Sequence, residues 1–378
     1  MQRRRPAGVV AQRKEKPSKT RLLMATVEEI RSLVSQIVDP EIGRTLGELR
    51  QIRNVRCDDA SITVDIDLLT PAYPLIERLQ TIVEEQLRSL VSDGQTLTVN
   101  LHPTVRGKDA GGRIGLKVHN VIAVGSGKGG VGKSTIAAAL ACGLKSFGCR
   151  VGLMDADVYG PSIPHMLGAK GQPAAKELQG PDGKKVVRIE PIDVDGLKLM
   201  SMGFFMEDGQ SVVWRGPMLH KALTQFLKDT DWGELDYLVI DLPPGTGDVS
   251  LTLSQLIGLA GAVIVCTPQQ VALLDAIKAV DMYQKVNVPV LGFVENMTGE
   301  IFGRGGARKV AEELKVPFLG EVPIQACIRE LSDSGQIPKL LDQDCPARES
   351  LQEVCCNIAM QVARNLIDTP SAPTLEIL

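Results

Sequence analysis

A glycine-rich run in the first half of the chain has the composition of a phosphate-binding loop. Residues 125–135 read Gly-Ser-Gly-Lys-Gly-Gly-Val-Gly-Lys-Ser-Thr and contain the pattern G-x4-G-K-S. In such a loop the backbone N–H groups surround phosphate oxygens, the lysine reaches the β- and γ-phosphates, and the next hydroxyl binds Mg²⁺. The predicted nucleotide-binding residues of this loop are Gly127, Lys128, Gly129, Gly130, Val131, Gly132, Lys133, Ser134 and Thr135.

Acidic residues follow two apolar segments farther along the chain. Asp155 and Asp157 come after the apolar segment 151–154, and Asp241 follows the apolar segment 237–240. At the carboxyl ends of parallel strands they would lie beside the glycine-rich loop, where open α/β sheets bind ligands. We expect Asp241 to hold Mg²⁺, Asp155 to lie nearer the metal than Asp157, and Asp157 to orient the attacking water. For Asp155 and Asp157 the alternative is an ordinary role in a turn or helix cap. With Lys128 and Lys133, Asp157 and Asp241 form the predicted catalytic set.

Short apolar segments alternate with segments of helical spacing through most of the chain. This alternation predicts a mostly parallel sheet covered by helices on both faces, an α/β P-loop domain over residues 119–368. The glycine-rich loop lies between a strand and a helix that begins near Ile136, as a phosphate loop requires. Residues 170–205 interrupt the alternation, and we interpret them as an insertion. The predicted strands are 121–124, 151–154, 237–240, 262–265, 290–294 and 318–319.

The segment 24–102 has the pattern of a small α+β domain that precedes the P-loop domain. Thr26 and Glu29 fit a capping box at the start of a helix. Residues 103–118 are rich in Gly, Lys and Arg and are predicted to be a linker. The other predicted elements of the small domain are strands over 61–68 and 96–101 and a helix over 75–90.

The composition limits the classes of protein to which the chain could belong. Its 378 residues carry a net charge of −3 with 44% hydrophobic content. Residues 1–21 hold eight Lys or Arg and one Glu, so the remainder is acidic, which argues against a nucleic-acid-binding protein. We expect residues 1–23 to be a disordered basic segment and residues 369–378 to be a tail. No apolar run approaches the roughly 18 residues of a membrane span. We therefore predict a cytoplasmic protein that binds neither membranes nor nucleic acid.

Lys128 is a second lysine inside the phosphate loop. A further ammonium beside Lys133 needs an anionic partner of its own, and the alternative is a solvated side chain. The run from Lys128 to Ser134 resembles the signature KGGxGK[ST] of the ParA/MinD-type ATPases. This resemblance implies a homodimer in which Lys128 reaches the nucleotide of the other subunit. It also implies that Asn296 contacts the adenine edge.

Further motifs resemble the Mrp/ApbC-type iron-sulfur cluster carrier ATPases, and residues 24–102 resemble the PaaD/SufT-like domain often fused ahead of them. The resemblance implies an ATP- and Mg²⁺-dependent homodimer that holds a labile [4Fe–4S] cluster and passes it to apoproteins, in contact with assembly factors. The motifs are Tyr159-Gly-Pro-Ser162, Trp214-Arg-Gly-Pro-Met218, the run 236–248, Thr267-Pro-Gln269, Val294-Glu-Asn-Met297, Asp39-Pro40-Glu41 and Leu69-Thr70-Pro71-Ala72.

The cysteines depart from this family pattern. Members place a CxxC shortly after the run that ends at Met297, where this chain has no cysteine, and Tyr73 replaces the usual cysteine of the small domain. Cluster ligands need thiolates, so the sequence leaves them unknown. Cys355 and Cys356 are adjacent on a predicted helix, a poor chelating geometry that favours packing. Cys142, Cys149 and Cys266 are predicted core residues, and Cys327 and Cys345 are weak candidates in loop-like surroundings.

Two other functions remain open from the sequence. One is an ATP-switched positioning protein of the ParA/MinD type, although residues 369–378 have no Lys or Arg to dock on a membrane. The other is a regulator that kept the ATP switch and lost the metal chemistry. The segment 214–218 is predicted either to lie near the nucleotide or the dimer surface, or only to begin a helix at Pro217.

Overall fold

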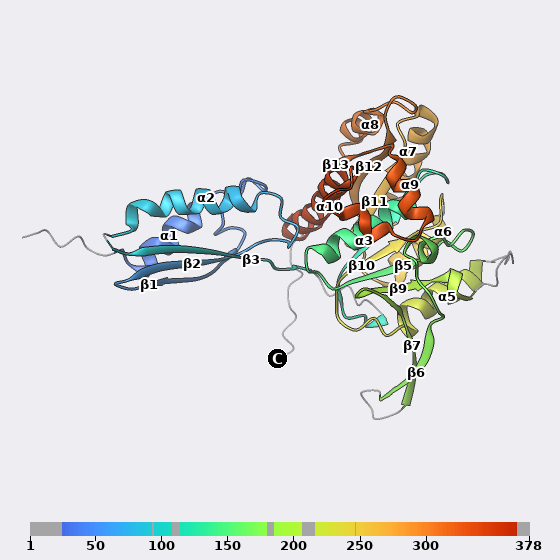
Figure 1. Cartoon of the computed structure of the whole chain (residues 1–378), viewed down its shortest axis with the longest axis horizontal. Helices are drawn as coiled ribbons and strands as arrows, with labels where there is room; N and C mark the ends of the chain where they lie inside the picture. The colour runs from blue at the N-terminus through green and yellow to red at the C-terminus, as the bar shows by residue number, and fades with distance from the viewer. Residues whose placement is uncertain are drawn as a thin grey trace, which may run out of the picture.

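The larger part of the chain is built on a sheet of eight strands in the order β13-β12-β11-β4-β10-β5-β9-β8 (Figure 1). Neighbouring strands are parallel except β8 and β9, which are antiparallel. The computed structural model describes residues 25–92, 94–107, 114–179, 185–205, 216–245 and 247–368. The strands are β4 (Val118–Gly125), β5 (Val151–Asp155), β8 (Ile192–Val194), β9 (Leu197–Ser201), β10 (Leu235–Asp241), β11 (Gly261–Cys266), β12 (Val290–Thr298) and β13 (Phe318–Pro323).

Helices cover both faces of this sheet, because each central strand is apolar on both sides. In β4, Ile122 and Val124 belong to one core and Val121 and Ala123 to the other. The first core is closed by α3 (Lys133–Ser146), α4 (Ile163–Met166), the 3-10 helix η4 (Ile337–Leu341) and α10 (Arg348–Asp368). The second is closed by α5 (Gly216–Asp229), α6 (Gly247–Leu256), α7 (Gln270–Lys285) and α8 (Gly306–Leu314). The predicted α/β fold is confirmed.

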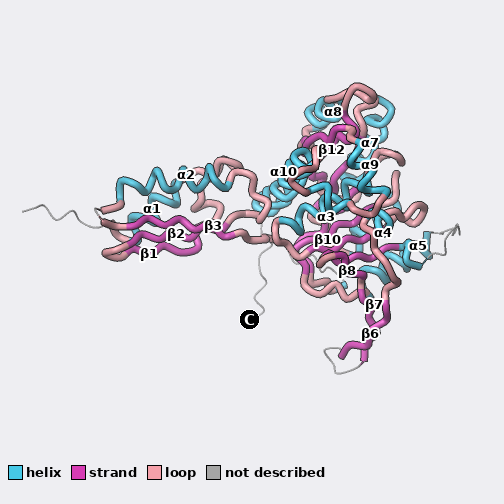
Figure 2. The backbone as a smooth tube through the Cα atoms, viewed as in Figure 1, coloured by secondary structure: helices cyan, strands magenta, loops and turns pink. Residues whose placement is uncertain are grey.

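The segment predicted as an insertion divides into two parts. Strands β6 (Ala174–Gln179) and β7 (Lys185–Glu190) form a separate antiparallel pair that projects from the body (Figure 2). Strands β8 and β9, in contrast, belong to the central sheet, where β9 pairs in parallel with β5 and β8 pairs with β9 at the edge. The interpretation of all of 170–205 as an insertion is therefore wrong for β8 and β9. Strand β9 is followed by the short 3-10 helix η3 (Met202–Phe205).

The small N-terminal part packs two helices on a three-stranded sheet. Its sheet has the order β1-β2-β3, with β2 and β3 parallel and joined through α2. The predicted capping box is confirmed, because Glu29 N donates to Thr26 Oγ1 at 3.2 Å and Thr26 N donates to Glu29 Oε2 at 2.8 Å. Strand β1 was not predicted, since it is mostly half-exposed and carries two arginines. The elements are α1 (Val27–Gln36), β1 (Ile52–Cys57), β2 (Ser61–Asp67), α2 (Ile76–Leu87), the 3-10 helix η1 (Arg88–Leu90) and β3 (Thr96–His102).

The last helix joins the two parts. Met360 of α10 is buried in the core of the small domain, and Arg364 Nη2 donates to the backbone oxygen of Glu41 at 2.7 Å and to its Oε1 at 2.8 Å. In return, Ala72 of the small domain is buried in a core of the P-loop domain. No helix within the described ranges is long and apolar enough to cross a membrane.

Candidate nucleotide-binding site

The glycine-rich loop connects β4 to α3 at the carboxyl edge of the sheet. Gly132 has φ +78°, and a Cβ built there would lie 2.3 Å from Asn296 Nδ2. A side chain at this position would therefore meet both backbone strain and a steric clash. Asn296, near the carboxyl end of β12, donates from Nδ2 to the carbonyl oxygen of Val131 at 2.9 Å. The predicted adenine-contacting residue thus lies against the loop and holds it in place, and its adenine contact stays a prediction.

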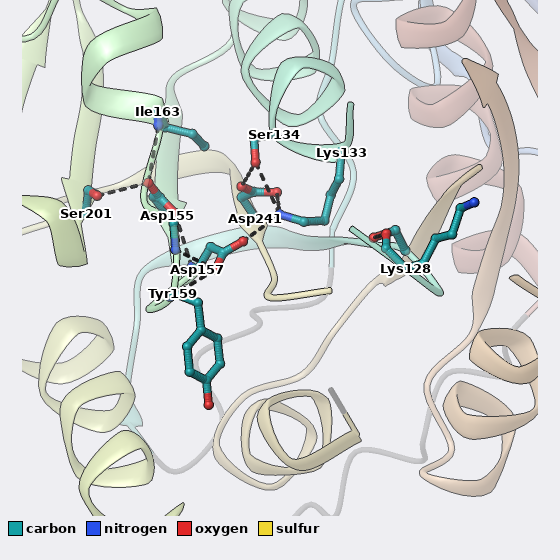
Figure 3. A network of polar contacts seen from close by, with 11 residues as sticks. Lys128, Lys133, Ser134, Asp155, Asp157, Tyr159, Ile163, Ser201 and Asp241 are labelled. Atoms are coloured by element: carbon teal, nitrogen blue, oxygen red, sulfur yellow. Dashed lines mark hydrogen bonds and ion pairs between the residues drawn. The ribbon is translucent and has the colours of Figure 1, made fainter. Parts of the chain in front are cut away.

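Three predicted ligands meet at the start of α3 (Figure 3). Lys133 Nζ donates to Asp241 Oδ1 at 2.6 Å, and Ser134 Oγ donates to Asp241 Oδ2 at 2.6 Å. Asp241 is fully buried at the end of β10, and Lys133 is 6% exposed. The helix N-terminus adds the positive end of its dipole at the same place. The site therefore combines phosphate-binding donors with one carboxylate and one hydroxyl suited to Mg²⁺.

Asp157 and Asp155 have different surroundings, although both follow β5. Asp157 Oδ2 lies 3.7 Å from Lys133 Nζ, while its Oδ1 accepts hydrogen bonds from the backbone of Tyr159 and Gly160. Asp157 therefore faces Lys133, the lysine predicted to bind phosphate. Asp155 is fully buried and accepts three hydrogen bonds, from Ser201 Oγ at 3.0 Å, Asp157 N at 3.1 Å and Ile163 N at 3.3 Å. Its carboxylate thus holds the segment that carries Asp157, and its predicted proximity to the metal stays a prediction.

Burial makes the carboxyl groups of Asp155 and Asp241 costly to ionise. Burial and the neighbouring Asp241 raise the pKa of Asp155 to about 8. Burial also raises the pKa of Asp241, although Lys133 and Ser134 oppose that shift. A bound cation would relieve both effects, because it favours the ionised carboxylates. Over the described residues, no group of three or more His, Cys, Asp or Glu side chains lies close enough together to hold a metal ion. Mg²⁺ does not require such a group, since it is commonly bound by one or two carboxylates together with nucleotide phosphates.

Lys128 points away from the cluster around Asp241 (Figure 3). Its backbone is fixed, because Ser126 Oγ donates to the Lys128 carbonyl oxygen at 2.9 Å. Within the part of the chain that the structure describes, no carboxylate forms an ion pair with its ammonium. The side chain is half-buried and its charge is directed away from the site of its own subunit. The segment 214–218 lies outside the described residues up to Arg215, and α5 begins at Gly216.

Both positions where the family pattern has a cysteine are filled by other structure. Gly299 N donates to Gly303 O at 2.9 Å and Gly303 N donates to Gly299 O at 2.8 Å, so residues 299–303 form a closed turn. In the small domain the buried Tyr73 hydroxyl donates to Asp39 Oδ1 at 2.8 Å. Neither place offers a thiolate to a cluster.

The cysteines divide by burial. Cys142, Cys149, Cys266 and Cys355 are buried, as expected for core residues. Burial raises the pKa of Cys142, Cys149 and Cys266 to about 12. Cys327 and Cys345 are half-exposed, and their sulfur atoms lie 3.7 Å apart. Both were weak candidates from the sequence, but their proximity could not be predicted, because the two residues are 18 positions apart on different elements.

Comparisons with known proteins match both parts of the chain. The family model described as NUBPL iron-transfer P-loop NTPase matches residues 117–359, and the model described as iron-sulfur cluster assembly protein matches residues 27–97. An iron-sulfur cluster carrier protein of Deinococcus radiodurans is 44% identical over 348 residues, which cover 89% of this chain and 96% of the relative.

Two further proteins are similar to part of the chain. The iron-sulfur cluster transfer protein NUBPL of Dictyostelium discoideum is 46% identical over 257 residues, 65% of this chain and 77% of the relative. A solved structure of a nucleotide-binding protein from Archaeoglobus fulgidus, in complex with ADP, is 39% identical with a TM-score of 0.50 and covers 59% of this chain and 89% of that chain.

Proposed function

Because the chain belongs to the family of NUBPL iron-transfer P-loop NTPases, we propose that it is a Mg²⁺-dependent ATPase that carries iron-sulfur clusters to apoproteins. The membership confirms the resemblance drawn from the motifs. The observation that carries the ATPase proposal is the meeting of Lys133 and Ser134 on the carboxylate of Asp241. The names of the relatives favour a cluster carrier over a positioning protein.

In this proposal the loop residues bind and orient the triphosphate. Lys133 exchanges its contact with Asp241 for phosphate oxygens, and the loop N–H groups and the α3 dipole hold the remaining negative charge. Ser134 and Asp241 would hold Mg²⁺, which supplies positive charge to the phosphates when bound. The carboxylate of Asp157, 3.7 Å from the lysine, orients the attacking water. The described site contains charge stabilisation but no strong base, so we expect slow hydrolysis coupled to a conformational change.

The second lysine supports a nucleotide-bridged homodimer as the active form. Lys128 projects from a fixed loop backbone and is directed away from the phosphate site of its own subunit. An ammonium in this position can reach a phosphate held by a second copy, and the charge of that phosphate offsets the repulsion between the two lysines. Binding of ATP would then join two copies, and hydrolysis would release them. Cluster-accepting apoproteins and assembly factors are the proposed partners.

The experiment uses the full-length chain. It is reconstituted anaerobically with ferrous iron and sulfide, supplied with Mg²⁺-ATP, and mixed with an apo-ferredoxin as acceptor. We expect iron on the protein, ATP hydrolysis, and appearance of the acceptor's visible absorption. A Lys133→Ala variant should bind ATP about 10- to 100-fold more weakly, whereas Lys145→Ala at the other end of α3 should bind normally. A wild-type protein that takes up no iron would contradict the carrier function, and one that hydrolyses no ATP would contradict the ATPase.

A further inference from the structure

Cys327 and Cys345 form a thiol pair outside the nucleotide site. Cys327 is the second residue of α9 (Ala326–Asp333), and Cys345 lies in the segment between η4 and α10. Their Sγ atoms are 3.7 Å apart, and both residues are half-exposed. We propose that Cys327 and Cys345 are the thiols through which this chain holds its iron-sulfur cargo, an inference that rests on the proposed carrier function.

The spacing of the two sulfurs suits a single tetrahedral metal atom. Two thiolates bound at about 2.3 Å to one tetrahedral centre lie roughly 3.7 to 3.8 Å apart. Cysteine thiolates are the usual ligands of iron-sulfur clusters, and [2Fe–2S] clusters have two on each iron. The 3.7 Å separation therefore needs little rearrangement to place both sulfurs on one iron. The sequence resemblance implied [4Fe–4S], in which each thiolate binds a different iron, so this pair favours [2Fe–2S] cargo.

The surroundings hold the two thiols close together. Gln325, which precedes α9, donates from Nε2 to the Pro346 carbonyl oxygen at 3.3 Å and accepts from the Cys327 thiol at 3.5 Å. The Gln325 side chain thus links the start of α9 by a hydrogen bond to the segment that carries Cys345. The N-terminal position of Cys327 on α9 adds a favourable helix dipole for its thiolate. Iron binding must still displace protons, because burial and Cys345 together raise the pKa of Cys327.

The other described cysteines are less suited to carry cargo. Four of them are buried, and Cys355 lies against the α3 backbone, with its Sγ 3.8 Å from the Ala139 oxygen. Cys57 is in the small domain, where its sulfur contacts the Ala25 carbonyl oxygen. Cys356 follows Cys355 on the continuous helix α10, so the two side chains point about 100° apart. A cargo ligand must be reachable by an acceptor, and Cys327 and Cys345 are the described pair that combines exposure with a second thiol.

Two thiols leave the remaining cluster positions open. A second copy of the chain or an acceptor protein can supply the other thiolates. During transfer each bond from iron to Cys327 or Cys345 is replaced by a bond to an acceptor thiolate. The released cysteine takes up the proton that the acceptor thiol lost. No electron is transferred, so the oxidation state of the iron does not change. Holding the cluster through only two thiolates of this chain thus favours its release to an acceptor protein.

The test is anaerobic loading of reduced full-length protein with ferrous iron and sulfide, followed by iron counting and visible absorption. Cys327→Ser and Cys345→Ser should each lose most of the bound iron, at least about ten-fold in affinity. Cys57→Ser and Cys356→Ser, which also remove a half-exposed thiol, should load like the wild type. Binding of ATP should be unchanged in all four variants, which shows that they are folded.

The outcomes separate this inference from the function on which it rests. If the wild type loads iron and the Cys327 and Cys345 variants load equally well, the thiol assignment is wrong and the carrier function stands. If the wild type takes up no iron, both the thiol assignment and the carrier function are wrong. If the wild type loads poorly and mass spectrometry shows Cys327 and Cys345 joined with the loss of two hydrogens, the pair is a disulfide and not a cargo site.

Discussion

Lys133 Nζ lies 2.6 Å from Asp241 Oδ1, although the two residues are 108 positions apart in the chain. The lysine begins α3 and the aspartate ends β10, so the contact forms only when the strand and the helix are both in place. The same carboxylate also accepts the hydroxyl hydrogen of Ser134. One buried carboxylate thus orients both the ammonium proposed to bind phosphate and the hydroxyl proposed to bind Mg²⁺.

The role of Ser134 can be tested by removing its hydroxyl alone. A Ser134→Ala variant should need at least about ten-fold more Mg²⁺ for half-maximal ATP hydrolysis, because one oxygen ligand is lost. Ser134→Thr keeps the hydroxyl and should retain the magnesium dependence of the wild type. Titration of ATPase activity with Mg²⁺ in all three proteins gives the comparison. Equal magnesium requirements in the alanine and threonine variants would show that the hydroxyl is not a ligand.

Lys128 should matter for association and not for binding within one subunit. Since its ammonium is directed away from Asp241, Lys128→Ala should bind ATP within about three-fold of the wild-type affinity but lose ATP-dependent dimerisation and most of its hydrolysis. Sedimentation with ATP and with ADP measures the dimer, and calorimetry measures binding. Lys278→Ala, which removes an exposed lysine of α7, is the control. A Lys128→Ala protein that still dimerises with ATP would refute the bridging role.

Much of the phosphate loop and of the local helix structure could be predicted, because the signals for these features lie in short runs of consecutive residues. The phosphate loop needs only a short run of glycines between a strand and a helix, and the capping box at Thr26 needs four consecutive residues. The hydrogen bond from Asn296 to Val131 could not be derived, because it depends on how β12 lies beside the loop.

Contacts between distant elements account for the remaining differences. Cys327 and Cys345 meet because α9 packs beside the segment before α10, and no local pattern encodes that packing. Strand β9 joins the central sheet by pairing with β5, while the irregular sequence before it resembles an insertion. The fold class followed from apolar periodicity, but these pairings required the tertiary structure.

The stability of the nucleotide-free protein should fall as the pH rises from about 4 to about 8. Asp155 has a folded-state pKa of about 8, above the unfolded value near 3.8, so the folded state binds its proton more tightly. The contribution to the free energy of unfolding is therefore full below the unfolded pKa and is lost as pH rises through the folded pKa. Asp241 acts in the same direction, since its pKa is also raised. We expect the free energy of unfolding to decline steadily over this pH range.

Urea unfolding followed by circular dichroism, in the presence of a chelator, measures this profile. Asp155→Asn removes one of the titrating groups and should flatten the decline. Asp58→Asn is the control, because the backbone of Ala60 and Ser61 lowers the pKa of this exposed carboxylate, which is ionised in both states above pH 5. A wild-type profile without a decline between pH 5 and pH 8 would contradict the proposed cost of ionising Asp155.

Substitutions at two glycines of the loop can distinguish the cost of backbone strain from the cost of a steric clash. Gly130 and Gly132 both have φ +78°, but a Cβ at Gly130 would meet no atom within 4 Å, whereas one at Gly132 would lie 2.3 Å from Asn296 Nδ2. Gly130→Ala should therefore cost only the strain, about 1 kcal/mol. Gly132→Ala should cost about 2 to 4 kcal/mol and weaken ATP binding further, since Asn296 must release Val131. Urea unfolding and calorimetric titration with ATP measure both effects. Equal losses in the two variants would show that the contact with Asn296 does not determine the loop conformation.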